Sequence, residues 1–364
     1  MSFELPTAAL DLDELAELRS TVRSAATESG YPGEVRELEL STSGLDPELW
    51  SLLAQDIGLG GVGLPETAGG LGGLAEILAV AEELGAALAP VPFVTSTVLC
   101  GQVLAACGDA AMPCVERIAS GEIAAPAFTN NRGLWSPTDL SCSSDGVSVS
   151  GSIRFTPFGA NAAFFVVGAR TDAGIDVFVV EAADAQVQAL PSLDFSSPSA
   201  TVTFDSAPAI RLTHDGSGEG AISQGVDLAL LAVAADQLGG SQACFDMTLE
   251  YIKVRRQFNR EIGSFQAIKH RMADALMLVE MLRSGLEKVT SGGADDLAVE
   301  AAVNKSWGSD SYIAMTAEAI QLHGGIGFTW EHNAHLYFRR ARYDSAFLGD
   351  SVFQRERLAT LLNW

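Results

Sequence analysis

The stretch VRRQFNREIGSFQAIKHRMADALMLVE, Val254–Glu280, ends one helical pattern, begins another and gathers positive charge. Six of the 22 lysines and arginines lie between Lys253 and Arg271, although the 364-residue chain has a formal net charge of −24. A local group of cations in so acidic a chain indicates a bound anion. The overall charge argues against a general binder of nucleic acid or of anionic membranes, because both need a broadly basic surface.

A long helix is predicted directly before this break, over Val226–Phe258. Its Gly239–Gly240 pair indicates close packing against a neighbouring segment, because a helix tolerates such glycines when they serve a contact. Asn259–Gly263 interrupts the pattern, and Ser264 is expected to cap the next helix, 265–288.

Two further helical patterns follow, LAVEAAVNKSWGSDSYIAMTAEAIQLH and EHNAHLYFRRARYDSAFL. Four helices with broad apolar faces predict a bundle over residues 216–364. Residues 1–120 are also predicted to be helical, since DLDELAELRSTVRSAA and LAEILAVAEELGAALA repeat apolar residues every three or four positions. Residues 121–215 alternate and are rich in Val, Phe and Thr, which predicts a small antiparallel β-domain, a barrel or a sandwich. The sequence therefore predicts three domains of α, β and α character.

The five cysteines are an odd number without paired spacing, and no histidine joins them in a zinc pattern, which predicts reduced thiols. The N-terminus, MSFELPTAALDLDELAEL, lacks the basic start and apolar core of a signal peptide. No apolar run is expected to span a bilayer. A cytoplasmic protein without a membrane, nucleic-acid or metal partner is the expectation.

The first candidate site combines Arg255, Phe258 and Gln266, two of them at a predicted helix end and the third in the first turn of the next helix. A guanidinium pairs bidentately with phosphate, and an amide donates a further hydrogen bond. The alternative is that Arg255 and Arg256 only complement the negative end of their helix.

The second candidate site is QLHGGIGF, Gln321–Phe328, in which Gly324 and Gly325 separate two helical patterns. Backbone without Cβ atoms can approach a diphosphate closely. The alternative is a glycine cap that only joins two helices. His323 is expected to pack or to cap rather than to act as a base.

The two sites occur together, and VRRQFNREIGSFQAIKHRMAD and QLHGGIGFTWEHNAHLYFRRAR closely resemble the acyl-CoA dehydrogenase family. GVGLPETAGGLGG and AEELGAALAPVPF agree with the same resemblance, which covers nearly the whole chain. It implies an α+β fold with an N-terminal helical domain, a middle antiparallel β-barrel and a C-terminal four-helix bundle. It also implies FAD as the cofactor and oxidation of an acyl-CoA thioester to its 2,3-enoyl-CoA.

The resemblance implies roles for individual residues. In the family, Arg-x-x-Phe, a Gln eleven residues after the Arg, and Gln-x-x-Gly-Gly-x-Gly contact the FAD diphosphate and adenosine across a subunit interface. The matching residues in this chain are Arg255, Phe258, Gln266, Gln321, Gly324, Gly325 and Gly327. The anion indicated by the cation cluster is therefore expected to be the FAD diphosphate. Asn259 departs from the Gly that usually follows the Phe.

The resemblance also implies a glutamate base, which takes the proton α to the thioester while the β-hydrogen leaves as hydride. The usual position after the fourth helix reads AFLGD and holds Leu348, and the second position holds Ala229, followed by Leu230. Neither position has a carboxylate. In the middle domain, only Thr129 remains of the family's flavin loop, and the aromatic-x-Thr contact is partly kept as Phe155–Thr156.

These departures predict the non-catalytic half of a heteromeric acyl-CoA dehydrogenase, of the kind that bacteria use on steroid side chains. The expected partners are a homologous subunit carrying the catalytic Glu, an acyl-CoA substrate, and an electron-transfer flavoprotein or similar acceptor. One alternative is a self-sufficient homomeric enzyme with Asp227, Asp344 or Asp350 as its base, although each of these is also explained as a solvated or capping carboxylate. The other alternative is a flavin-free acyl-CoA-binding scaffold.

Overall fold

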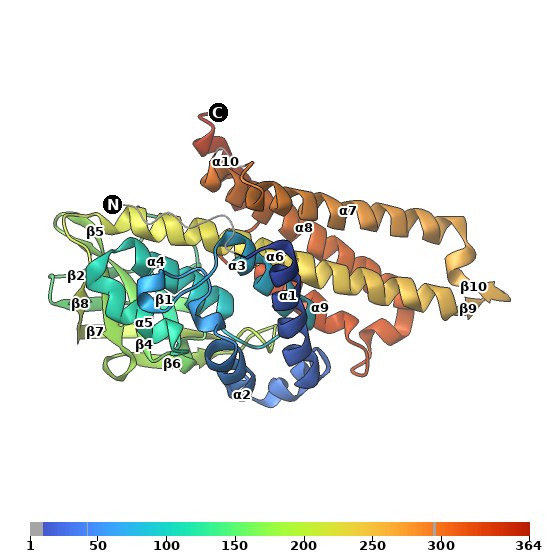
Figure 1. Cartoon of the computed structure of the whole chain (residues 1–364), viewed down its shortest axis with the longest axis horizontal. Coiled ribbons are helices and arrows are strands. Elements are labelled where there is room, and N and C mark those ends of the chain that lie inside the picture. The colour runs from blue at the N-terminus through green and yellow to red at the C-terminus, as the bar shows by residue number, and fades with distance from the viewer. Residues whose placement is uncertain (1–9, 42, 294–295) are drawn as a thin grey trace.

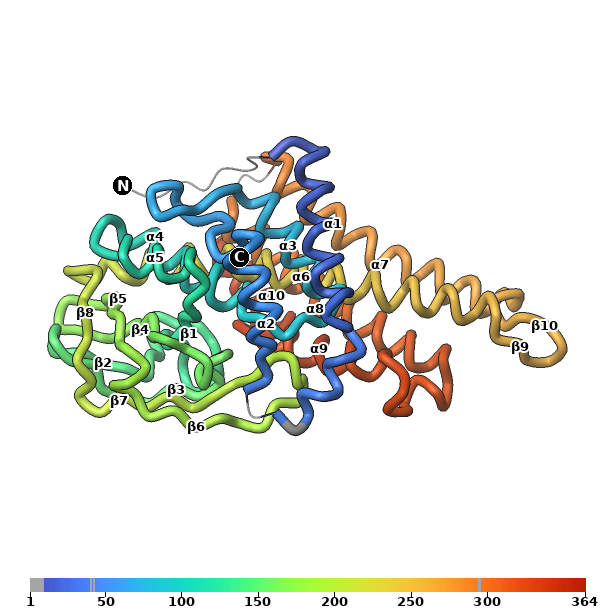
Figure 2. The backbone as a smooth tube through the Cα atoms, turned by 60° about the horizontal axis from the view of Figure 1, so that its bottom comes forward, coloured from blue at the N-terminus to red at the C-terminus, as the bar shows by residue number. Residues whose placement is uncertain are grey.

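The α+β fold class is confirmed by a computed structural model, which describes residues 10–41, 43–293 and 296–364 (Figure 1). A helical region is followed by a sheet, and the chain then returns to helices. The sheet lies at one end of the long axis, and a small hairpin projects at the opposite end in both views (Figures 1 and 2). The long helix α6 (Gly218–Val254) connects the two ends.

The described part of the N-terminal region contains five α-helices with short 3₁₀ and π turns between them. The helix α1 begins where Asp11 accepts hydrogen bonds from the backbone of Asp13 and Glu14, which satisfies two donors of its first turn. Most residues of α3 are buried against the rest of the molecule, as its continuous apolar sequence predicts. The bounds are α1 (Leu12–Glu28), α2 (Pro47–Ser51), α3 (Leu74–Ala87), α4 (Gly101–Ala106) and α5 (Met112–Ala119).

The middle region forms an eight-stranded sheet in the order β6-β7-β3-β2-β4-β5-β8, with β1 paired to β4. Most pairs are antiparallel, as predicted, but β4 runs parallel to both β1 and β2. The order ends at β6 and β8, so within the described residues the sheet is an open half-barrel. The bounds are β1 (Ala124–Ala127), β2 (Cys142–Ser144), β3 (Ser148–Pro157), β4 (Phe164–Thr171), β5 (Gly174–Glu181), β6 (Gln186–Leu190), β7 (Ser199–Pro208) and β8 (Ile210–Arg211).

The described part of the C-terminal region packs three further helices against α6, which is the central element of the fold, and packs its last helix mainly against one of these three. The predicted close packing at Gly239–Gly240 is confirmed. A Cβ on Gly239 would lie 1.9 Å from the Glu82 carbonyl oxygen, and one on Gly240 would lie 2.2 Å from the Tyr312 hydroxyl. The bounds are α7 (Gln266–Thr290), α8 (Leu297–His323), α9 (Ala334–Ala346) and α10 (Ser351–Leu361).

The end of the long helix differs from the prediction. The helix α6 stops at Val254, and the next residues form a two-stranded hairpin, β9 (Arg256–Gln257) and β10 (Arg260–Glu261). Phe258 and Asn259 both have positive φ, which gives the tight turn that fits a twisted hairpin. The predicted Ser264 cap is wrong, because its hydroxyl donates to the Glu261 carbonyl and α7 begins without a side-chain cap.

The structure differs from the sequence predictions at two further helices, α10 and α6. The helix α10 was not predicted; it begins where Asp350 accepts a hydrogen bond from the Phe353 backbone. By length and composition alone, the helix α6 is long and apolar enough to cross a membrane, so the prediction that no apolar run can do so is wrong. However, 89% of its most apolar 18-residue stretch is buried inside the protein. It is therefore a core helix. The five cysteines are free, as predicted.

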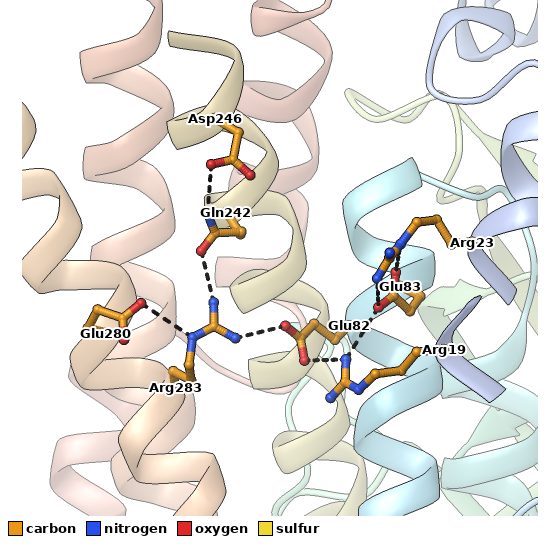
Figure 3. Close-up of polar contacts among 8 residues, drawn as sticks. All are labelled: Arg19, Arg23, Glu82, Glu83, Gln242, Asp246, Glu280 and Arg283. Carbon is orange, nitrogen blue, oxygen red and sulfur yellow. Dashed lines mark hydrogen bonds and ion pairs between the residues drawn. The ribbon is translucent and has the colours of Figure 1, made fainter. Parts of the chain in front are cut away.

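A polar network joins helices from both ends of the sequence (Figure 3). Glu82 on α3 pairs with Arg19 on α1 at 2.8 Å and with Arg283 on α7 at 3.2 Å. Arg283 also donates to Gln242 on α6 at 2.8 Å, and Glu83 pairs with Arg23, which lies on α1. These contacts connect α1 and α3 of the N-terminal region to α6 and α7 of the helical bundle.

Candidate functional site

The residues predicted to bind an anionic cofactor lie at the end of the helical bundle that is remote from the sheet (Figure 1). Arg255 caps the C-terminus of α6, Phe258 sits in the turn of the hairpin, and Gln266 is the first residue of α7. Arg255 and Gln266 are exposed, and 87% of the Phe258 surface is accessible. The fold therefore brings these three residues onto one projecting tip.

Arg255 differs from the neighbouring arginines because its side chain has no partner among the described residues. Arg256 donates to the Asn259 carbonyl at 3.1 Å, and the Arg260 guanidinium lies 3.7 Å from the centre of the Phe265 ring. Among the described residues, the Arg255 side chain makes no hydrogen bond or ion pair, while its backbone carbonyl accepts from Ile262 at 2.8 Å. An exposed guanidinium on a fixed backbone is suited to an anion from outside the chain.

The glycine motif forms the turn that ends α8. Gly324 has a φ of +64°, a conformation that favours glycine. A Cβ on Gly324 or Gly325 would meet no atom within 4 Å, so the backbone there is open to a large ligand. Gly327 is buried, and a Cβ on it would lie 3.1 Å from the Ile320 carbonyl oxygen. Gln321 is exposed on the last turn of α8. Open backbone and an amide donor fit a diphosphate.

The turn after α8 also carries histidines. His323 is buried and its Nδ1 lies 2.8 Å from the Ala319 carbonyl, which confirms the expectation of a packing or capping role. Its ring stacks on that of Tyr251 and is tilted by 52° against that of His332, each at a centroid distance of 4.3 Å. Burial lowers the pKa of His323, and burial and neighbouring cations lower the pKa of His332 to about 4. Within the described residues, no cluster of metal-binding side chains is present.

The structure places two buried apolar residues where the family resemblance puts a glutamate. Leu348 follows α9 with a φ of +56° and is 2% exposed. Its carbonyl accepts from the buried Gln354 amide at 2.8 Å. Ala229 is fully buried in α6. Neither side chain can accept a proton.

A cavity of about 310 Å³ lies between the sheet and α9, and Phe155, Tyr343 and Phe347 line it, with Arg132 also at its wall. The cavity is mostly apolar, and its described lining contains no carboxylate. Thr156 lies beside Phe155 on β3, and its buried hydroxyl has no hydrogen-bond partner among the described residues. Thr129, two residues after the end of β1, is also buried.

Sequence reasoning missed a buried charge cluster centred on Arg340. Its guanidinium donates to Asp194 at 2.7 Å, to Asp236 at 3.0 Å, to the Ser196 hydroxyl at 2.9 Å and to the Ala89 carbonyl at 3.4 Å. These partners come from the N-terminal region, the middle region and α6. The available signal was the position of Arg340 three residues after the buried Tyr337, on the inner face of α9.

The cluster holds more carboxylates than cations. Asp344 lies next to Asp236, burial raises the pKa of both, and their mutual repulsion raises that of Asp344 further. Burial and repulsion between the two carboxyl groups therefore favour a protonated carboxyl in the folded chain. The space that remains beside Arg340 is only about 40 Å³, enough for a few water molecules.

The three aspartates considered as alternative bases have separate explanations. Asp350 caps α10, as expected of a capping carboxylate. Asp227 and Asp344 are neither solvated nor capping, contrary to expectation, because Asp227 is buried against Arg357 and Asp344 belongs to the Arg340 cluster. Burial raises the pKa of Asp227. All three carboxylates are thus engaged in structural contacts.

Comparison with known proteins is consistent with this arrangement. Residues 13–122 match the family model for the acyl-CoA dehydrogenase N-terminal domain, and residues 216–362 match the C-terminal domain. Acyl-CoA dehydrogenase IpdE2 of Mycolicibacterium smegmatis is 33% identical over 94% of this chain and 96% of its own.

Two solved structures of two-component complexes have similar folds. The ChsE4–ChsE5 complex from Mycobacterium tuberculosis superposes with a TM-score of 0.87 and 29% identity, covering 97% of this chain and 98% of the matched one. The steroid ACAD Tcur3481–Tcur3483 superposes with a TM-score of 0.85 and 29% identity, covering 96% and 98%.

Proposed function

From the premise that this chain belongs to the acyl-CoA dehydrogenase family, we propose that it is one subunit of a heteromeric, FAD-dependent acyl-CoA dehydrogenase. The complex desaturates an acyl-CoA thioester to the 2,3-enoyl-CoA. This chain contributes contacts to the FAD diphosphate and adenosine, and a homologous chain supplies the catalytic glutamate. The heteromeric relatives favour this assembly, and the steroid ACAD among them favours a substrate from steroid or lipid degradation.

The separation of the two ends of the molecule carries this proposal. The exposed tip with Arg255 and Gly324 lies at one end, and the sheet with Thr156 lies at the other (Figure 1). One FAD molecule cannot contact both ends of the same chain. The tip is therefore suited to an FAD whose ring lies in a neighbouring subunit.

The tip residues fit the nucleotide half of FAD. Arg255 has no partner within the described chain and can pair with the diphosphate, while Gln266 and Gln321 offer amide donors. Gly324 and Gly325 leave the backbone accessible. Phe258 is almost fully exposed, which favours a stacking contact with an aromatic ring of the ligand or of the neighbour.

The interior of the chain does not fit the oxidation itself. FAD, when bound, supplies the acceptor for the hydride, but a base must also remove the α-proton. Leu348 and Ala229 cannot do so, and the cavity beside Phe155 has no carboxylate in its described lining. The base is therefore assigned to the partner chain.

Co-expression with a homologous chain that carries the glutamate tests the proposal. This chain alone is expected to show no acyl-CoA oxidation, and the purified pair is expected to bind FAD and to oxidise the thioester. The expected flavin content is below one per chain. A homo-oligomer of this chain with one flavin per chain and unaided turnover would falsify the proposal.

An Arg255→Ala variant tests the assigned contact. Losing a charge-assisted, hydrogen-bonded pair weakens binding by about 1.5–3 kcal/mol, which is roughly a 10- to 150-fold increase in the Kd for FAD. Arg256→Ala is the matched control, because Arg256 lies on the same hairpin but already contacts Asn259. Unchanged FAD retention in both variants would instead favour the flavin-free scaffold.

One observation favours a self-sufficient enzyme as the second candidate. Asp344 is buried beside a cavity and its pKa is raised, as expected for a general base. However, the cavity of about 40 Å³ is too small for an acyl chain, and Arg340 and Asp236 occupy its wall. The Asp344→Asn experiment described in the Discussion separates the two candidates.

A further inference from the structure

We propose that the stack of Tyr251 on His323, with the tilted His332 ring against it, positions the two nucleotide-binding segments of the tip relative to each other. This inference rests on the proposed function, because it assumes that both segments contact one FAD. It assigns the three side chains a positioning role rather than direct contact with the cofactor.

The stack joins the ends of two helices. Tyr251 lies in the last turn of α6, and the Arg255 amide donates to its carbonyl at 2.9 Å. His323 is the last residue of α8 and directly precedes Gly324. The Tyr251 ring stacks on the His323 ring with centroids 4.3 Å apart, and its hydroxyl donates to the His323 carbonyl at 3.3 Å. A shift of either ring therefore displaces Arg255 from Gly324.

Contacts to His332 and to the N-terminal region hold His323 in place. The His332 ring lies 4.3 Å from that of His323, and its Nδ1 accepts from the Ala334 amide, which orients the ring. Arg36, from the N-terminal region, donates to the Trp330 carbonyl and to Asn333, on either side of His332. The glycine turn is thus supported from behind while its front stays open.

The stack requires neutral imidazoles. His323 is 4% exposed, its Nδ1 faces the Ala319 carbonyl, and its Nε2 has no partner among the described residues. The groups that face the histidines are Tyr251 from α6, His332 and His335 from the segment after α8, Arg36 from the N-terminal region and Arg339 from α9. No carboxylate in this set would stabilise an imidazolium.

Acid should therefore loosen the tip. Burial lowers the pKa of His323 in the folded protein, so the stack is fully stable above the ordinary histidine pKa. As the pH falls below about 6.5, states with an open stack take up a proton and become more populated. The pKa of His332 is also lowered, to about 4, so proton uptake by His332 in the open state acts in the same direction as proton uptake by His323.

FAD affinity of the co-expressed pair provides the test, measured at pH 7.5 and at pH 5.5. His323→Ala is expected to raise the Kd for FAD roughly tenfold at pH 7.5, the factor that the loss of an aromatic stack can produce. His323→Phe keeps a flat ring without a titrating group. It is expected to retain affinity within about threefold at pH 7.5 and to lose less affinity at pH 5.5 than the wild-type pair.

The outcomes separate this inference from the proposed function. If Arg255→Ala weakens FAD binding but His323→Ala and Tyr251→Leu do not, the positioning role is overturned while the proposed function stands. If Arg255→Ala also has no effect, the proposed function fails, and the positioning role fails with it. If His323→Ala does not fold, His323→Phe still decides the matter, because an unchanged loss of affinity at pH 5.5 overturns the role of His323.

Discussion

Asp344→Asn distinguishes a buried structural carboxyl from a displaced catalytic base. In the folded chain, Asp344 faces Asp236 next to Arg340, and burial raises its pKa well above the ordinary range. An asparagine has the same shape and is neutral, and its amide can donate to Asp236 in place of the carboxyl proton. The substitution therefore fixes the protonation that the cluster already requires.

The sign of the pH effect follows from proton linkage. The folded wild-type chain keeps a proton that the unfolded chain releases above about pH 4. Its free energy of unfolding therefore falls as the pH rises towards the folded pKa, by up to about 1.4 kcal/mol per pH unit for one proton. For a chain of 364 residues this corresponds to about 2 °C in Tm per pH unit. The asparagine variant lacks this slope, so its advantage grows with pH.

Two assays check this reasoning. Thermal unfolding of the chain is followed from pH 5.5 to 8.5, and acyl-CoA oxidation by the co-expressed pair is followed at pH 7.5. We expect a flatter Tm profile for Asp344→Asn and turnover within about twofold of the wild type, because a neutral asparagine reproduces the protonated acid. A variant with normal flavin content and fold but turnover reduced roughly a hundredfold or more would refute the reasoning, because general bases contribute about 10²–10⁴ to the rate.

Three further predictions concern stability. Arg340→Leu is expected to lower the free energy of unfolding by about 3–5 kcal/mol in urea denaturation, because it leaves buried carboxylates unpaired; Arg339→Leu, a half-buried neighbour, should cost much less. Gly239→Ala should lower the free energy of unfolding because the added Cβ would meet backbone atoms. Gly220→Ala on the same helix is the control and should be neutral or stabilising by up to about 1 kcal/mol. A lower Tm for both variants would contradict this prediction. Glu82→Gln should lower stability by about 1 kcal/mol at low salt and less at high salt, and salt-independent loss would exclude an ionic origin.

The order of the three regions was predictable from the sequence because the apolar residues of each region recur at one characteristic spacing. The three-to-four-residue pattern of the N-terminal and C-terminal regions and the alternation between them come from local geometry alone, and the helices α1, α3 and α8 follow them closely. The close packing at Gly239 was also predictable, because glycine within a helix costs stability and usually occurs where a neighbouring segment packs closely.

The ends of the helices were less predictable. The helix α6 ends at Val254 because the chain reverses through Phe258 and Asn259, both with positive φ. Asparagine adopts this conformation readily, but phenylalanine rarely does, so Phe258 gave no signal of the turn. The helix that starts at Asp350 was not predicted, although a capping carboxylate was one interpretation of that residue. Boundaries depend on caps and turns that several residue types can form.

The sequence by itself determined the class of fold, the presence of a cation-rich segment and a glycine motif, and the absence of a carboxylate at positions 348 and 229. These properties reside in residue types and spacings along one segment. Only the tertiary structure decided that Arg340 gathers Asp194, Asp236 and Asp344, because these side chains come from separate elements and meet only when the regions pack. It also decided that the tip lies far from the sheet, since the length and direction of α6 set that separation (Figure 1).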